Sequence, residues 1–226
     1  MTVLHLADDG EAADLAAFLS RLLRYDRSAA VRLQAAGTAL AVFGRPPSFE
    51  VLAIRAVRLA KPYEDGLDVT LDVTVSAGEL LESVDESAAT AAVPGAVTGP
   101  PWAGVLPPRG GWQPEPGLPV PQALRATVAA AVGEFRSRTE ELGPDDRTRA
   151  ELDRIGRDIW SRTVAGTPLP VRAVHAAQSL GFLRPDRGGE AEAVLLSAGA
   201  WLRLRTPFGS IAVRRTGLGA FGVTVR

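Results

Sequence analysis

Residues 201–215 read WLRLRTPFGSIAVRR, and this stretch predicts a β-hairpin. Apolar and polar residues alternate on both sides of the segment 206–209, TPFG, whose composition is typical of a turn. If the turn is a four-residue loop, the aliphatic residues of both strands share one side of the hairpin and are buried. The other side, on which Trp201 pairs with Arg214, then carries Trp201, Arg203, Arg205 and Arg214.

The two strands of this hairpin are expected at 191–205 and 210–215, and a helix precedes them. Thr167 stands where an N-cap is expected and Pro168 where the first helical residue is expected. Gly181 is expected to end this helix, because glycine commonly follows the last helical turn.

Two longer helices are predicted upstream, at 122–141 and 145–163, where apolar residues recur at helical spacing. Residues 122–226 are therefore expected to form a lobe of three helices and a C-terminal β-hairpin. This is also the element order of a winged-helix module, in which the third helix enters the major groove of DNA and the hairpin touches the phosphate backbone.

The segment 94–121 predicts a different kind of structure. It holds nine of the seventeen prolines, which excludes regular helix or strand over most of its length. It also contains Trp102 and Trp112, and such large apolar side chains favour an ordered strap packed over the sheet or between the lobes rather than a flexible linker. The alternative is a polyproline ligand for an aromatic groove.

Residues 1–93 are predicted to form an α+β lobe in which one helix packs on a small antiparallel sheet. Asp8 and Glu11 have the spacing of a capping box, ahead of a helix expected at 10–25. Four runs with β-strand composition follow, at 30–34, 38–43, 49–59 and 68–76. The whole chain is therefore predicted to be an α+β protein.

The composition and motifs exclude several classes of site. The chain has no cysteine and only two histidines, His5 and His175, so disulfides, thiol nucleophiles and cysteine metal sites are excluded. The string 217–222, GLGAFG, matches the glycine pattern of dinucleotide-binding folds, but only four residues follow it, too few for the helix and acidic residue that the pattern needs. No catalytic residue, metal ligand or cofactor is therefore predicted.

Charge is distributed unevenly along the chain. Residues 1–100 carry 8 basic and 14 acidic side chains, whereas residues 101–226 carry 17 and 12. A basic half can favour a polyanionic partner. Arginine outnumbers lysine 24 to 1 and asparagine is absent, a pattern typical of high-GC coding, so part of the arginine excess reflects base composition.

The hypothesis that uses most of these features is a non-enzymatic binding protein that contacts nucleic acid through 168–215. Arg172, His175 and Gln178 would face the groove of the nucleic acid from the third helix. On the hairpin, Arg203, Arg205 and Arg214 would neutralise phosphates and Trp201 would stack on a base. The opposing interpretation is that a guanidinium over Trp201 merely covers an exposed sheet.

Two further functions remain open. A protein-interaction or scaffold component would use the strap through Trp102 and Trp112. An enzyme acting on a small molecule would need a polar cleft between the lobes, where Arg109, beside Gly110 and Gly111, would hold an anion.

The strap at 100–112 and the string 196–215 resemble those of an uncharacterised actinobacterial protein family, and the likeness covers most of the chain. The resemblance implies a bacterial cytoplasmic protein and implies no particular activity, ligand or catalytic residue. The sequence favours the same location and no membrane partner, because it has no run of about 18 apolar residues and no signal-peptide pattern at its N-terminus.

Overall fold

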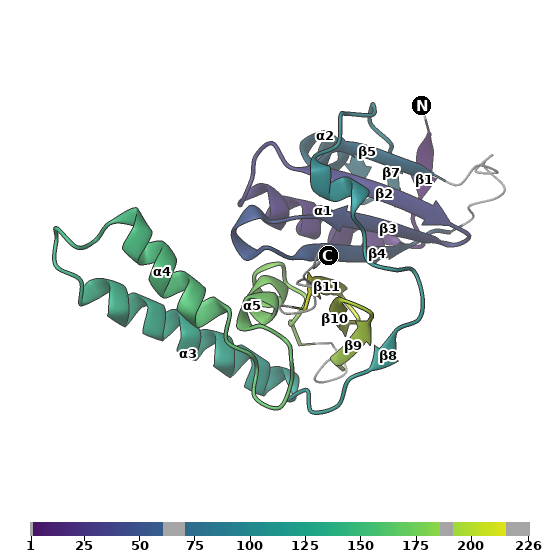
Figure 1. Ribbon diagram of the computed structural model, residues 1–226. Helices are drawn as coiled ribbons and strands as arrows, with labels where there is room; N and C mark the ends of the chain where they lie inside the picture. Colours follow the sequence, from purple (N-terminus) through teal and green to yellow (C-terminus); the bar gives the residue numbers. More distant parts are fainter. Residues whose placement is uncertain (1, 61–70, 186–191, 216–226) are drawn as a thin grey trace, which may run out of the picture.

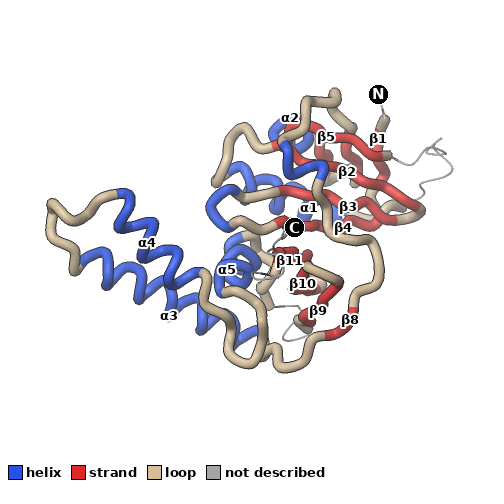
Figure 2. Tube along the Cα trace, viewed as in Figure 1, coloured by secondary structure: helices blue, strands red, loops and turns tan. Residues whose placement is uncertain are grey.

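The computed structural model describes residues 2–60, 71–185 and 192–215. It has an α+β fold around one eight-stranded antiparallel sheet, with the strand order β5-β2-β3-β4-β11-β10-β9-β8 (Figures 1 and 2). These strands are β2 Ala30–Ala36, β3 Ala39–Gly44, β4 Leu52–Arg58, β5 Asp72–Ser76, β8 Gln113–Pro114, β9 Val194–Ala198, β10 Trp201–Thr206 and β11 Gly209–Arg214. A second sheet has the order β1-β7-β6 and consists of β1 Val3–His5, β7 Thr90–Ala92 and β6 Val84–Asp85.

The two halves of the chain meet inside the large sheet. Strand β4 of the N-terminal half pairs with β11 of the C-terminal half, and Ala53 lies opposite Ile211. The predicted hairpin, β10 and β11, therefore has a neighbouring strand on each side. The division into units at 1–93, 94–121 and 122–226 stays a prediction.

The described ranges contain five helices. They are α1 Asp9–Leu23, α2 Ala77–Glu82, α3 Pro121–Glu140, α4 Arg149–Trp160 and α5 Val171–Ser179, and two short 3-10 helices are η1 Pro47–Phe49 and η2 Pro101–Gly104. Helices α1 and α5 cover one face of the sheet, where their apolar sides join Leu33, Leu204 and Ile211 in the main core. Phe18 of α1 stacks on Phe182, which follows α5, with 5.7 Å between the ring centroids.

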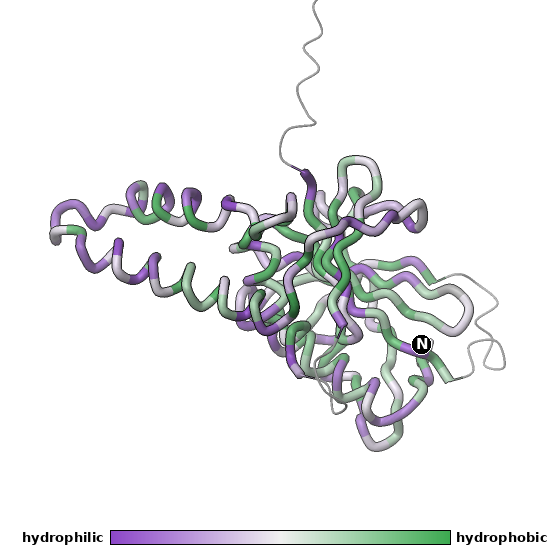
Figure 3. Tube along the Cα trace, turned by 90° about the horizontal axis from the view of Figure 1, so that it is seen from below, coloured by the Kyte–Doolittle hydropathy of each residue, from purple (hydrophilic) through white to green (hydrophobic). Residues whose placement is uncertain are grey.

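Helices α3 and α4 form an arm that projects from the body of the protein (Figures 1 and 3). Helix α3 buries Leu124 and Val128 near its start, where it contacts α5. Farther out, Arg162 donates hydrogen bonds of 2.6 and 2.9 Å to Glu134 and so joins the end of α4 to α3. Because the Arg162 bonds favour the charged carboxylate, the pKa of Glu134 is lowered.

Local patterns predicted two features correctly. The Asp8 carboxylate caps α1 by accepting a hydrogen bond of 2.8 Å from the main-chain nitrogen of Glu11. The hairpin has the predicted register, with Trp201 opposite Arg214. In both cases the pattern specifies contacts between near neighbours in sequence, which tertiary packing does not override.

Two predicted elements were wrong. The single strand expected at 191–205 is two antiparallel strands, β9 and β10, because the chain reverses at Gly199, whose φ of 55° suits glycine. The helix expected from Thr167 begins instead at Val171. The Thr167 hydroxyl stabilises a preceding turn, in which it donates to the carbonyl oxygen of Val164 at 3.0 Å and accepts from the nitrogen of Leu169 at 3.2 Å.

Other boundaries moved for local reasons. The helix expected at 145–163 starts at Arg149, because the Thr148 side chain caps it at the main-chain nitrogen of Glu151. The run 49–59 becomes a strand only from Leu52 onward, after η1. Residues 68–70 of the last N-terminal run, and the string 217–222, lie outside the described residues.

With a winged-helix module, the structure shares only the order of elements, three helices followed by a hairpin. Five of the nine residues of α5 are buried, and β10 and β11 lie in the interior of the sheet rather than at its edge. No helix of the described ranges is long and apolar enough to span a membrane. In those same ranges, no three side chains of the histidine, aspartate or glutamate type group together as a metal site.

Candidate functional site: an arginine and tryptophan groove

The proline-rich strap crosses the face of the large sheet that α1 and α5 leave open. At its start, the nitrogen of Val97 donates a hydrogen bond of 2.9 Å to the carbonyl oxygen of Thr74 on β5. Midway, the guanidinium of Arg32 donates to the carbonyl oxygen of Ala103 in η2. At its end, β8 pairs with β9. The strap is therefore ordered and attached at three places across the sheet.

Beneath the strap lies a small second core. Trp102 and Leu106 of the strap, and Trp201 of β10, pack on four buried residues of this face, which are Phe43, Leu52, Ile54 and Ala212. These contacts place two tryptophans from distant parts of the sequence on the same side of the sheet.

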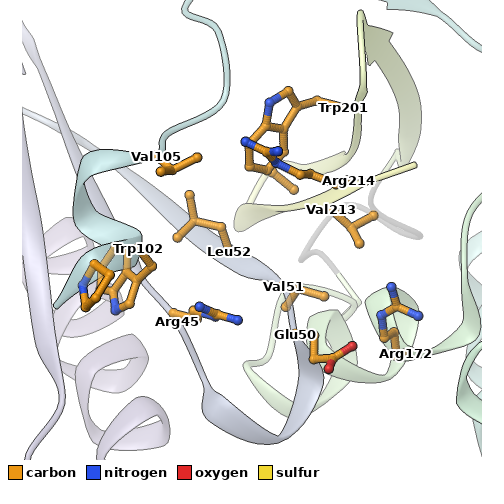
Figure 4. A pocket seen from close by; sticks show the side chains of 12 residues that line it. Arg45, Glu50, Val51, Leu52, Trp102, Val105, Arg172, Trp201, Val213 and Arg214 are labelled. Carbon is orange, nitrogen blue, oxygen red and sulfur yellow. The ribbon is translucent and has the colours of Figure 1, made fainter. Parts of the chain in front are cut away.

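A cavity of about 380 Å³ opens between the strap, the start of β4, the end of β11 and the start of α5 (Figure 4). Leu52, Ala212 and Val213 give it an apolar lining, and Trp102 and Trp201 add aromatic surface. Cavities of roughly 300–1,000 Å³ with mostly apolar walls and a few polar groups are typical of ligand sites. The first requirement for binding, a concave apolar surface, is met here.

The polar lining of the cavity is mostly cationic. Arg45 follows β3, Arg172 is the second residue of α5, and Arg214 is the last residue of β11, so three separate elements supply a guanidinium each. Glu50 supplies the carboxylate of the lining. None of the three arginines forms an ion pair with another residue of the described part of the chain. The cavity therefore carries a net positive charge.

One of these arginines has an unused donor. The Nε atom of Arg172 is buried and has no hydrogen-bond partner among the described residues. A buried donor without a partner costs about 1–3 kcal/mol, which a shift of the Arg172 side chain toward an acceptor on a ligand would recover.

Trp201 and Trp112 each lie beneath an arginine guanidinium. The guanidinium carbon of Arg214 is 5.1 Å from the ring centroid of Trp201, and that of Arg203 is 5.7 Å from Trp112. Burial lowers the pKa of Arg203, and the positive charge of Arg205 lowers it further. The positive surface thus continues along β10 beyond the cavity.

Two of the predicted contact residues lie elsewhere. The imidazole of His175 is stacked on Trp160 at 4.7 Å and meets the edge of Phe49 at 5.0 Å, so its ring is part of the packing between α5, α4 and η1. Burial lowers the pKa of His175. Gln178 is exposed near the end of α5, more than one turn from Arg172. The structure therefore brings Arg172, Trp201 and Arg214 together, and leaves His175 and Gln178 apart from them.

The strap residues also divide into two groups. Trp102 lines the cavity, whereas Trp112 is half-buried and donates from Nε1 to the carbonyl oxygen of Pro108 at 3.0 Å. Arg109 is exposed near Asp72, whose pKa is lowered chiefly by its hydrogen bond with Arg32 and in smaller part by the charge of Arg109. Trp112 and Arg109 thus interact within the strap and sheet.

Sequence reasoning missed Arg45 and Glu50. The stretch from 45 to 47 has turn composition, which gives no sign that its arginine lines a cavity. Glu50 adopts a left-handed backbone with φ of 52°, a conformation uncommon for residues other than glycine. Such local strain often occurs at functional sites, but it is visible only in the folded chain.

The chain matches two domain families of unknown function. Residues 1–104 match the model described as domain of unknown function DUF8010, and residues 107–218 match that of DUF8185. These matches are consistent with an uncharacterised family. Among the curated proteins, none matches the chain.

The boundary between the two matched regions falls in the strap, beside the cavity. Arg45 and Trp102 come from the DUF8010 region, whereas Arg172, Trp201 and Arg214 come from the DUF8185 region. The cavity therefore needs both regions to be present. The actinobacterial assignment and the cytoplasmic location stay predictions.

Proposed function

We propose that this protein is a non-enzymatic nucleic-acid-binding protein, and that the cavity between Trp102 and Trp201 takes a nucleotide of a single strand. The observation that carries the proposal is the arrangement of Arg45, Arg172 and Arg214 around this aromatic cavity, without acidic partners in the described part of the chain. The ligand class is the one predicted from the sequence, whereas the proposed contact surface is the cavity rather than an exposed helix and hairpin.

The phosphate would lie between Arg172 and Arg214. Guanidinium groups bind phosphate oxygens through paired, charge-assisted hydrogen bonds, which are stronger than bonds between neutral groups. After a shift of its side chain, Arg172 would offer its unused Nε donor to an oxygen acceptor of this kind. Arg203 and Arg205, farther along β10, would attract the neighbouring phosphates of the strand.

The base would lie against the tryptophans and the apolar lining of the cavity. Stacking of a base on an aromatic ring tolerates any base, because every base has a flat π surface. Glu50 supplies an acceptor for N–H groups on base edges, such as the amino group of cytosine or the ring N–H of thymine. One acid among three arginines is therefore compatible with a nucleotide.

A single strand fits this surface better than a duplex. Reading the major groove requires an exposed helix face, whereas most of α5 is buried and His175 is held between Trp160 and Phe49. Stacking in a cavity requires an unpaired base, which single strands provide. Trp201 and the arginines can act on such a strand without any rearrangement of α5.

Salt dependence tests the proposal. Binding of a labelled short oligothymidylate is measured by fluorescence anisotropy at increasing salt. With three phosphates neutralised, affinity should fall roughly 20-fold between about 50 and 200 mM salt. An Arg149→Glu variant is the control and should show the same salt dependence as wild type. Arg149 lies outside the cavity, at the start of α4 on the projecting arm, and its side chain is 96% exposed. Affinity that does not change with salt would contradict the proposed contacts.

A further inference from the structure

A second cavity, of about 620 Å³, adjoins the first. Both cavities are lined by Arg45 and Trp102, so these two residues stand at the junction between them. The second cavity is polar rather than cationic. Its polar side chains besides Arg45 are Asp26, Ser28, Ser76 and Thr98.

We propose that the two cavities together bind a dinucleotide unit, with one nucleoside in each cavity and the connecting phosphodiester at Arg45. This inference rests on the proposed function, because it assigns the first nucleoside to the cavity described above. Trp102 would then lie between the two bases and offer aromatic surface to both.

The distribution of charge favours this placement. Arg45 is the cation of the second cavity, and it is exposed and forms no ion pair with a described residue. A nucleoside without its phosphate is neutral, and the second cavity, with Arg45 and the Asp26 carboxylate, has no net formal charge either; Arg45, which lines both cavities, is placed to meet the phosphate that joins the two nucleosides. Arg172 and Arg214 would remain available to the other phosphate of the ligand.

The hydrogen-bonding groups of the second cavity also suit a sugar and a base. The Oδ1 atom of Asp26 accepts hydrogen bonds from the nitrogen and hydroxyl of Ser28, at 2.9 and 2.7 Å, and so holds that carboxylate in place. The Ser76 hydroxyl accepts from the nitrogen of Glu79 at 3.3 Å and keeps its own proton for donation. Acceptors and donors are thus both present for sugar hydroxyls and base edges.

The same chemistry exists in a single-stranded nucleic acid and in a free dinucleotide. The first continues beyond the two cavities toward Arg203 and Arg205, whereas the second ends within them. Comparing a two-nucleotide ligand with a longer strand therefore separates these sources.

Two exposed valines of the strap allow a matched test. Val97 lines the second cavity and is 40% exposed, and Val105 lines the first and is 49% exposed. Tryptophan at either position would fill one cavity without disturbing the core. Titration calorimetry of thymidine 5′-monophosphate and of pTpT is carried out on the full chain and on the variants Val97→Trp and Val105→Trp, each with its thermal melting curve as a check of folding.

The wild-type protein should bind pTpT at least about fivefold more tightly than the mononucleotide, because one more base is stacked. Val97→Trp should remove this difference and leave mononucleotide binding intact, whereas Val105→Trp should weaken both ligands. A longer oligothymidylate that binds more tightly than pTpT would identify the strand as the source, and equal affinity would identify the free dinucleotide.

Equal affinity of wild-type protein for pTpT and the mononucleotide, or a preference for pTpT that survives Val97→Trp, would overturn the two-cavity inference while leaving the proposed function intact. Failure of every nucleotide ligand to bind would overturn both. If Val97→Trp fails to fold, Thr98→Trp fills the same cavity from the next residue and gives the same comparison.

Discussion

The guanidinium of Arg214 lies 5.1 Å from the centre of the Trp201 indole, across the pair of strands β10 and β11. The pair stands at the cavity rather than on an open sheet, because the strap reaches over this face and brings Trp102 to the same cavity. The contact of Arg214 with Trp201 therefore borders a concave, positively charged site, and it does more than cover an exposed sheet.

Trp201→Ala should weaken binding of oligothymidylate by roughly 5- to 150-fold, the range expected for the loss of one stacked base. Trp201→Phe should retain most of the affinity, because it keeps a flat ring on the same strand. Fluorescence anisotropy titrations of both variants measure this difference. Equal losses in the two variants would show that stacking on Trp201 is not part of binding.

Arg55 joins the two halves of the chain, and its removal should destabilise the fold. It is 5% exposed, and it donates to the carbonyl oxygen of Phe208 at 2.8 Å and to Glu11 at 2.9 Å. Arg55→Met should lower the free energy of unfolding by about 1–3 kcal/mol, because it removes the donor to the Phe208 carbonyl oxygen and one partner each of Glu11 and Asp14, which keep Arg58 and Arg184. Urea unfolding measures this loss. Arg149→Met serves as the exposed control, with an expected change of at most about 1 kcal/mol.

His175 should make stability depend on pH. Its folded pKa lies below the ordinary 6.5 because burial disfavours the charged ring, so the unfolded chain binds the proton more tightly. The free energy of unfolding is therefore unaffected by His175 protonation above about pH 6.5, and it decreases as the pH falls from there toward the folded pKa. His175→Phe, which keeps a ring against Trp160 and Phe49, should lose less stability than wild type between about pH 7.5 and pH 5.5. Identical pH profiles from urea unfolding would refute this role.

Two glycines should respond to alanine in opposite directions. A Cβ atom at Gly209 would lie 2.5 Å from the ring of Phe182, so Gly209→Ala should destabilise the protein by about 1–3 kcal/mol. A Cβ at Gly133, inside α3, meets nothing within 4 Å, so Gly133→Ala should stabilise by about 0.5–1 kcal/mol. Thermal melting of both variants checks the pair. A destabilised Gly133→Ala would mean that this part of α3 has packing requirements beyond helix propensity.

The sequence predicted those features that depend on neighbouring residues. Alternation within 201–215 was sufficient for the hairpin register, and the Asp8 cap follows from a four-residue pattern. The break at Gly199 was missed because it lies in a run of small apolar residues that resembles continuous strand. The Thr167 and Pro168 pair has the composition of a helix start, but its hydroxyl bonds within the preceding turn instead.

The candidate site could be predicted only in part. Alternation put Trp201 and Arg214 on one side of the hairpin, and this placement depends on strand geometry alone. Arg45 and Glu50 reach the same cavity only because β4 pairs with β11, a contact between segments about 160 residues apart that no local pattern encodes. His175 was predicted to face the nucleic acid beside Arg172, yet its ring packs on Trp160 of α4 and Phe49 of η1, which are distant from it in sequence.

The central claim, that the cavity arginines bind phosphates, is tested most directly by the salt slope of binding in charge-reversal variants. The logarithm of affinity for a short oligothymidylate is measured against the logarithm of salt concentration for wild type, Arg172→Glu, Arg214→Glu and the control Arg149→Glu. Removing one phosphate contact should weaken binding and reduce the slope by roughly 0.7 for each cavity arginine, with no change in the control. If all four proteins show the same slope and affinity, the cavity is not the nucleic-acid site.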